Sequence, residues 1–220
     1  HKGIIQKRKP YSYVLSGENF GSVITDSSLG FTFTENSRLM KLSHYDDSPT
    51  MISGEQVYAF YKGKTYNLCH SSDSFRCKNG VAIYEGKISS VDYSLCVFVS
   101  PTKKEKYVIV SFSEEGITAL FSFKPLLCEK LSSKDRILYK KAESKKESSI
   151  LFYNPFSLCQ ENVYGFCSSL GTEVTKRFPF LQGEEICIFA TGQKILFRLG
   201  EATADSHPTA ITIEEALSEK

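Results

Sequence analysis

Short runs of alternating apolar and polar residues recur along most of this chain, and each run ends in Gly, Ser, Asn, Asp or Pro. An alternation of two puts successive side chains on opposite faces of a strand, whereas a helix would scatter them around its axis. The spacing predicts strands over residues 11–15, 21–25, 31–34, 56–61, 65–69, 74–78, 81–89, 91–100, 106–113, 116–124, 149–154, 164–168, 184–190 and 194–199. Because few helical patterns separate the runs, we expect an all-β fold of two packed antiparallel sheets.

Residues 91–99 show how such a strand divides its two faces. The odd positions are apolar, and they are Val91, Tyr93, Leu95, Val97 and Val99. Asp92 and Ser94 fall on the opposite face. One face is therefore predicted to line the core, and the other to begin an outer or cleft-lining surface.

Two local signals place a tight turn and a helix. Asn79-Gly80 joins two predicted strands, and this dipeptide accepts the positive φ angles of a type I′ hairpin turn. Near the C-terminus, Thr212 is followed three residues later by Glu215, which is a capping-box pattern. The sequence thus predicts a hairpin at Asn79 and a short C-terminal helix.

Composition and charge exclude several classes of partner. A chain of 220 residues with 41% hydrophobic content suits one large β domain or two small ones. Lys and Arg (27) nearly balance Asp and Glu (25), so the net charge of +2 gives no strong field for nucleic acid or an anionic membrane. No apolar run approaches the roughly 20 residues that span a bilayer, and the first residues lack the apolar stretch of a signal peptide. We expect a cytoplasmic protein with a small polar partner.

The pattern also suggests a division of the chain. Residues 1–9 do not begin with Met and are expected to be a tag or disordered lead, residues 10–200 the β domain, and residues 201–220 a linker and the start of a helix. The basic, Ser-rich stretch 130–148 interrupts the β pattern. It predicts a solvated loop or surface hairpin. The alternative is a phosphate-binding patch, although no glycine-rich cradle accompanies it.

Cysteine usage favours reduced thiols. The seven cysteines are an odd number, and none forms a C-x-x-C pair. Cys96 and Cys187 lie inside apolar runs, where Cys behaves as a small buried hydrophobic residue. The alternative is a metal site formed by Cys69, His70 and Cys77. These residues lack a second ligand pair and a fourth ligand at a known spacing. No metal and no cofactor is therefore assigned.

A long polar loop follows the predicted strand 31–34. Its amide, guanidinium and carboxylate groups recognise sugar hydroxyls through paired donors and acceptors, and a tyrosine offers a flat face to a pyranose ring. The candidates for a carbohydrate cleft are Asn36, Ser37, Arg38, Tyr45, Asp46 and Asp47. The alternative is that the Asn and Asp residues make Asx turns and that Arg38 pairs with Glu35.

This region carries a resemblance to a known family. Residues 20–42 read F-G-x-x-x-T-D-x-x-x-G-F-T-F-x-x-N-S-R-x-x-K-L. The run resembles the start of the N-terminal domain in family 94 glycoside phosphorylases, which include cellobiose and chitobiose phosphorylases, and in cyclic β-1,2-glucan synthases. Further likenesses follow in the same order at 53–58, 70–80, 95–108 and 150–155. The resemblance covers about residues 10 to 200 and is most specific over 20–49.

The resemblance implies a supersandwich related to galactose mutarotase, placed ahead of an (α/α)6 barrel. In that family the barrel carries the general acid and the phosphate site, while the sandwich supports it, helps form a homodimer and borders the sugar cleft. By this likeness the loop at Asn36, Ser37 and Arg38 and the turn at Asp46 and Asp47 are candidates to approach the cleft. The chain has no Trp, and Phe33 and Tyr45 stand where the family often has Trp, which puts a sugar-stacking platform in doubt. The implied role is a non-catalytic, carbohydrate-associated domain of a larger phosphorylase or glycosyltransferase.

Two other functions stay open. One is a free-standing aldose 1-epimerase, which needs a His acid and a carboxylate base converging on the sugar. His44, His70 and several Glu residues are the nominees, but the sequence places no convergent pair. The other is a purely structural or dimerisation module. A G-x-S-x-G nucleophile motif is absent, so no catalytic residue is assigned to this chain.

Overall fold

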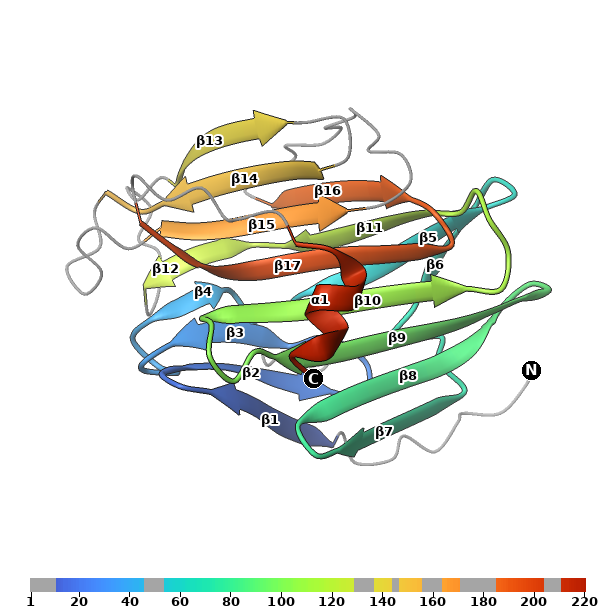
Figure 1. Ribbon diagram of the computed structural model, residues 1–220, viewed down its shortest axis with the longest axis horizontal. Helices are drawn as coiled ribbons and strands as arrows, with labels where there is room; N and C mark the ends of the chain where they lie inside the picture. The colour runs from blue at the N-terminus through green and yellow to red at the C-terminus, as the bar shows by residue number, and fades with distance from the viewer. Residues whose placement is uncertain are drawn as a thin grey trace, which may run out of the picture.

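The computed structural model describes residues 11–45, 54–128, 137–143, 147–155, 164–170, 185–203 and 211–220. These residues form antiparallel sheets of five, eight and four strands and one short helix (Figure 1). The all-β prediction is confirmed. No helix in the described ranges is long and apolar enough to cross a membrane.

Three sheets share the strands. The five-stranded sheet has the order β1 (Ser12–Gly17), β2 (Phe20–Thr25), β3 (Phe31–Thr34), β4 (Lys41–Ser43) and β12 (Pro125–Cys128). The eight-stranded sheet has the order β13 (Leu138–Glu143), β14 (Glu147–Tyr153), β15 (Tyr164–Leu170), β17 (Lys194–Ala202), β10 (Glu105–Phe112), β9 (Val91–Val99), β8 (Val81–Ile88) and β7 (Ser74–Lys78). The four-stranded sheet has the order β16 (Ile186–Thr191), β11 (Thr118–Phe123), β5 (Gln56–Tyr61) and β6 (Lys64–Asn67).

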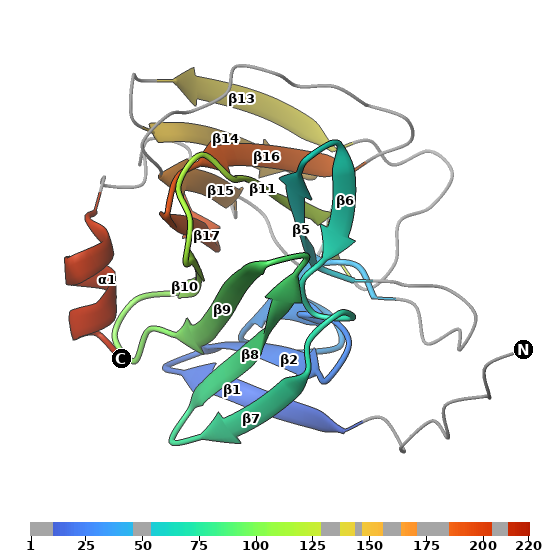
Figure 2. The same cartoon turned by 90° about the vertical axis from the view of Figure 1, so that its right-hand side faces the viewer.

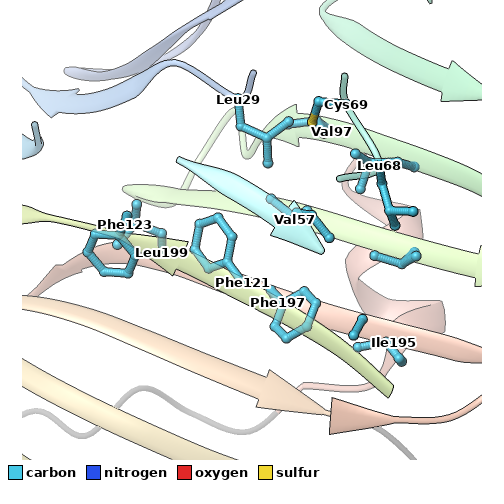
Figure 3. Close-up of a cluster of buried hydrophobic side chains, with 14 of the residues drawn as sticks. Leu29, Val57, Leu68, Cys69, Val97, Phe121, Phe123, Ile195, Phe197 and Leu199 are labelled. Atoms are coloured by element: carbon cyan, nitrogen blue, oxygen red, sulfur yellow. The ribbon is translucent and has the colours of Figure 1, made fainter. Parts of the chain in front are cut away.

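The main core lies between the eight-stranded sheet and the two smaller sheets (Figure 2). Phe121 of β11 stacks on Phe197 of β17 with ring centroids 5.8 Å apart, and it also contacts Phe123 at 5.5 Å. Figure 3 shows these rings beside Leu199 and Val57. Aromatic side chains bury large areas, so contacts of this kind hold the layers together.

Strand β9 divides its faces as the alternation predicts. Val91, Tyr93, Leu95, Val97 and Val99 all belong to the main core, while Asp92 is exposed and Ser94 is half-buried on the outer face. At the end of β7, Asn79 and Gly80 have φ angles of 53° and 76°. Both positive values agree with the predicted type I′ turn.

Helix α1 (Ile213–Ser218) covers the outer face of the eight-stranded sheet (Figures 1 and 2). The predicted capping box is present, because Glu215 N donates to Thr212 Oγ1 at 3.1 Å and Thr212 N donates to Glu215 Oε2 at 2.6 Å. Ala216 is fully buried against Phe98 and Tyr107 in a cluster separate from the main core. One helix face is thus held by apolar packing on the sheet.

A carboxylate fixes the end of this helix. Glu219 Oε2 accepts from Ser100 Oγ at 2.6 Å and from Tyr107 OH at 3.2 Å, and Glu219 Oε1 pairs with Lys103. Burial by itself would raise the pKa of Glu219, but the hydrogen bonds from Lys103, Ser100 and Tyr107 outweigh it and lower the pKa. The ionised carboxylate is therefore the form that the folded state favours.

Two short strands, β4 and β12, escaped the sequence analysis. Strands β4 and β12 have three and four residues, too few for an alternation to be recognised. Strand β13 pairs with β14 and lies inside the basic stretch 130–148, so part of that stretch is a hairpin.

The cysteines differ in burial. Cys69 and Cys167 are buried thiols, whereas Cys96 and Cys187 are half-buried. Burial raises the pKa of Cys69 to about 12.

Candidate functional site

The polar loop after β3 is built as an Asx turn. Asn36 Oδ1 accepts from the backbone N–H groups of Arg38 and Leu39, both at 2.9 Å, and Met40 N donates to Asn36 O at 2.9 Å. Residues 35–39 are exposed. The turn alternative therefore describes Asn36, whose side-chain oxygen is already occupied by its own backbone.

Tyr45 lies beside the five-stranded sheet. Its ring centroid is 6.0 Å from that of Phe31, with a tilt of 38° between the rings, and its side chain is half-buried. A Cβ added to Gly54 would lie 2.8 Å from the Tyr45 ring. This ring is packed against protein on that side. The other two candidates, Asp46 and Asp47, lie outside the described residues.

Ionic contacts connect the loop after β3 to the N-terminal end of β10. Glu35 pairs with Lys104 at 3.6 Å, and Lys104 also pairs with Glu201 at 2.9 Å. Thr34 donates a hydrogen bond to the same Glu201 carboxylate. Glu35 thus has Lys104 as a partner, which the sequence analysis did not foresee. The loop sits where β10 begins.

A buried ion pair joins all three sheets. Lys106 of β10 and Glu55, which precedes β5, are both 0% exposed, and their Nζ and Oε2 atoms lie 2.6 Å apart. Lys106 Nζ also donates to Ser22 Oγ at 2.8 Å and to Leu29 O at 2.9 Å. Lys106 thereby uses its three ammonium protons on protein acceptors.

The carboxylate of this pair is equally occupied. Glu55 Oε1 accepts from Thr32 Oγ1 at 2.6 Å and from Ser43 Oγ at 2.5 Å. Burial lowers the pKa of Lys106, and the opposing charge and hydrogen bond of Glu55 act against that shift. Sequence reasoning missed the pair, although its signal is visible: Lys106 shares the inward face of β10 with Val108 and Val110. Since every group has a partner inside the protein, this cluster serves the fold and offers nothing to a ligand.

An open pocket lies at the other end of β10. It has a volume of about 480 Å³ and spans strands β7 to β10, so we call it the β7–β10 pocket. Its lining residues are Asp73, Ser74, Glu85, Gly86, Lys87, Asp92, Tyr93, Ser94, Ser111, Phe112 and Ser113. A volume of this size lies in the range of small-molecule sites.

Register explains how these residues meet. Glu85 of β8 pairs with Ser94 of β9, which pairs with Ser111 of β10, so the three side chains form one row on the outer face. Lys87 pairs with Asp92 in the next row. Gly86 lies between the rows, and an added Cβ there would stand 2.9 Å from the Tyr93 hydroxyl. Packing of Tyr93 therefore requires glycine at this position.

The pocket holds both fixed and unused polar groups. Arg76 donates to both oxygens of Glu85 at 2.9 Å, and Lys87 pairs with Asp92 at 3.1 Å. Among the described residues, the hydroxyls of Ser94 and Ser111 make no hydrogen bond to protein. The alternation of residues 91–99 predicted Asp92 and Ser94 on an outer or cleft-lining face, which is confirmed. The other lining residues come from four strands, and no local pattern connects them.

The nominated histidines stand apart from this pocket. His44 directly follows β4 of the five-stranded sheet, and its backbone N–H donates to the backbone oxygen of Lys124 at 2.8 Å. His70 follows β6 of the four-stranded sheet and is exposed. Neither lines the β7–β10 pocket. Within the ranges that the structure describes, no three His, Cys, Asp or Glu residues are grouped to hold a metal ion.

Comparison with known proteins identifies the fold. No protein-family model and no curated protein matches this sequence. The crystal structure of a bacterial glucoamylase complexed with acarbose matches 97% of this chain with a TM-score of 0.55 and 9% identity, and the match spans 36% of the glucoamylase chain. A putative aldose 1-epimerase from Escherichia coli K12 matches 89% of this chain and 100% of its own, with a TM-score of 0.51 and 10% identity. The described architecture is a galactose mutarotase-like β-sandwich.

Proposed function

We propose that this chain is a non-catalytic, carbohydrate-associated domain that holds a saccharide in the β7–β10 pocket. The observation that carries the proposal is the row of Ser94 and Ser111 hydroxyls, which have no protein partner among the described residues, next to Glu85, which Arg76 holds in place. A saccharide presents hydroxyls that both donate and accept. The pocket offers serine hydroxyls of the same dual character and carboxylates that accept.

Rigidity of the frame supports a binding role. The lining side chains of β8, β9 and β10 are fixed by consecutive antiparallel pairing, so little ordering is required when a ligand enters. Proteins of this fold include a glucoamylase that was crystallised with acarbose and a putative aldose 1-epimerase. Both names concern carbohydrates, and this kinship raises the expectation of a sugar ligand without assigning a site.

The family 94 resemblance supplies the finer part of the proposal. There the sandwich domain supports an (α/α)6 barrel, borders its sugar cleft through the loop at Asn36 to Asp47 and contributes a homodimer surface. In this chain Glu35, directly before that loop, pairs with Lys104, directly before β10, and the β7–β10 pocket lies at the other end of this strand. Strand β10 has eight residues, which separates its ends by about 23 Å at about 3.3 Å per residue. A cleft contact at the loop and a saccharide in the pocket are therefore two separate functions.

An accessory role fits the pocket better than epimerase chemistry does. The epimerase needs an acid and a base free to exchange protons with the sugar. In the pocket Glu85 is held by Arg76 and Asp92 by Lys87. Asp73 is the lining carboxylate without a protein partner among the described residues, but no histidine lines the pocket to serve as the acid. Polarimetry separates the two functions: the chain should leave the mutarotation rate of freshly dissolved α-glucose and α-galactose unchanged, and acceleration would favour the epimerase.

Binding is tested by NMR titration of the chain with glucose and cellobiose at millimolar concentrations. We expect chemical-shift changes confined to residues 73–94 and 111–113, and their loss in the Ser94→Ala/Ser111→Ala double variant. Ser12→Ala/Ser16→Ala is the matched control, because both serines are exposed on the edge strand β1. The proposal fails if neither sugar shifts these signals, or if the pocket variant binds as well as the control.

A further inference from the structure

The charges of the β7–β10 pocket are unequal. Three carboxylates line it, those of Asp73, Glu85 and Asp92, whereas Lys87 is the lining cation. Arg76 stands just outside the lining and neutralises Glu85 through two hydrogen bonds of 2.9 Å. Lys87 neutralises Asp92 at 3.1 Å. Two of the three negative charges therefore have cation partners within the protein.

Asp73 is the carboxylate that remains. Its backbone N–H donates to Glu85 O at 2.8 Å, which fixes this lining residue directly before β7. Among the described residues, its carboxylate has neither a cation nor a hydrogen-bond donor as a partner. The pKa of Tyr93 in the pocket wall is raised, mainly by burial and further by the charges of Cys69 and Asp73. The pocket therefore carries one negative charge that the described protein leaves unbalanced.

We propose that the β7–β10 pocket binds an amino sugar with a free ammonium group more tightly than a neutral hexose. It should bind sugar phosphates and uronic acids less tightly than either. This inference rests on the proposed function. The ammonium would lie near Asp73 while the ring hydroxyls meet Ser94 and Ser111. A ligand with an anionic group would bring a further negative charge beside three carboxylates. The ligand class thus follows from one carboxylate and two hydroxyls that line the same pocket and have no protein partner among the described residues.

The size of the preference follows from exposure. Asp73 is exposed, and ion pairs between exposed groups are weak and screened by salt. We therefore expect the amino sugar to bind about two- to five-fold more tightly than the neutral sugar at low ionic strength. The preference should disappear at about 0.5 M salt, where charges are screened within a few ångströms.

The experiment is a set of NMR titrations of the whole chain with glucosamine, glucose and glucose 6-phosphate at about pH 6, where amines stay protonated. The expected order of affinity is glucosamine, glucose, glucose 6-phosphate. Asp73→Asn should bring glucosamine to the affinity of glucose when both sugars are titrated into the same variant. The control Glu18→Gln removes one negative charge from an exposed position outside the pocket and should keep the preference.

The outcomes separate this inference from the function on which it rests. Equal affinities for glucosamine and glucose in the unmodified chain overturn the charge preference and leave saccharide binding intact. A preference that survives Asp73→Asn overturns the assignment to that carboxylate. If none of the three sugars shifts the pocket signals, saccharide binding and the preference both fail.

Discussion

Two polar clusters lie on opposite faces of the same eight-stranded sheet. The inner one joins Lys106 and Glu55, whose side chains are 0% exposed, and the outer one is the β7–β10 pocket, where Lys87 and Asp92 are 65% and 63% exposed. Both contain a lysine, carboxylates and serine hydroxyls. The inner cluster has a protein partner for every group, whereas the outer one leaves Ser94, Ser111 and Asp73 without protein partners among the described residues.

The difference separates structural polar groups from groups that can bind. Removing a charge from water costs several kcal/mol, so a buried pair persists only when its geometry and hydrogen bonds offset that cost. Lys106 and Glu55 meet this condition because Ser22, Leu29, Thr32 and Ser43, on or beside strands of the five-stranded sheet, supply their hydrogen-bond partners. Water can serve the exposed groups of the pocket, and a ligand can replace that water.

The largest effect should come from breaking the inner cluster. Lys106→Met leaves the Glu55 carboxylate buried without its cation, and we expect a loss of about 3–5 kcal/mol in unfolding free energy. Guanidinium unfolding measures it. Lys106→Met/Glu55→Gln should lose less, because a neutral amide still accepts from Thr32 and Ser43. Lys87→Met in the pocket is the matched control, with an expected loss of less than about 1 kcal/mol. If Lys106→Met and Lys87→Met lost equal unfolding free energy, the proposed difference between the inner and outer clusters would be wrong.

Glu219 tests a case between the two clusters, because its side chain is 18% exposed. Glu219→Gln weakens the contacts to Lys103, Ser100 and Tyr107, and we expect a loss of about 1–2 kcal/mol. Because its folded pKa is lowered, this stabilisation is complete above the unfolded pKa of a glutamate, about 4.3, and is lost as the pH falls through the lower folded value. Hydrogen-exchange protection of residues 213–218 should therefore drop under acid. Glu214→Gln, an exposed neighbour, should leave that protection unchanged at neutral pH.

The smallest effect on stability belongs to the pocket serines. Ser94→Ala/Ser111→Ala removes hydroxyls that have no partner in the part of the chain that the structure describes, so unfolding free energy should change by no more than about 0.5 kcal/mol. Thermal unfolding and the sugar titration together check this result. A loss above about 1 kcal/mol would mean that the hydroxyls support the fold, and the outer cluster would then resemble the inner one.

The sequence predicted the position of some residues of the outer cluster and none of the inner cluster. It placed Asp92 and Ser94 on an exposed face, because an alternation of two is a local property of one strand. It nominated the loop at Asn36 for a sugar cleft and kept an Asx turn as the alternative, and the structure engages that side-chain oxygen in such a turn. The sugar-recognising residue types are the turn-forming types, so composition alone does not separate the two roles.

By itself the sequence determined the strands of residues 91–99, the turn at Asn79 and Gly80 and the capping box at Thr212. Each depends on residues within a few positions of one another. Only the tertiary structure brought Lys106 to Glu55, which lie 51 residues apart, and gathered the pocket from residues 73 to 113. The physical reason is that strand order and sheet packing decide which distant side chains share a face, and alternation within a strand carries no information about its neighbours.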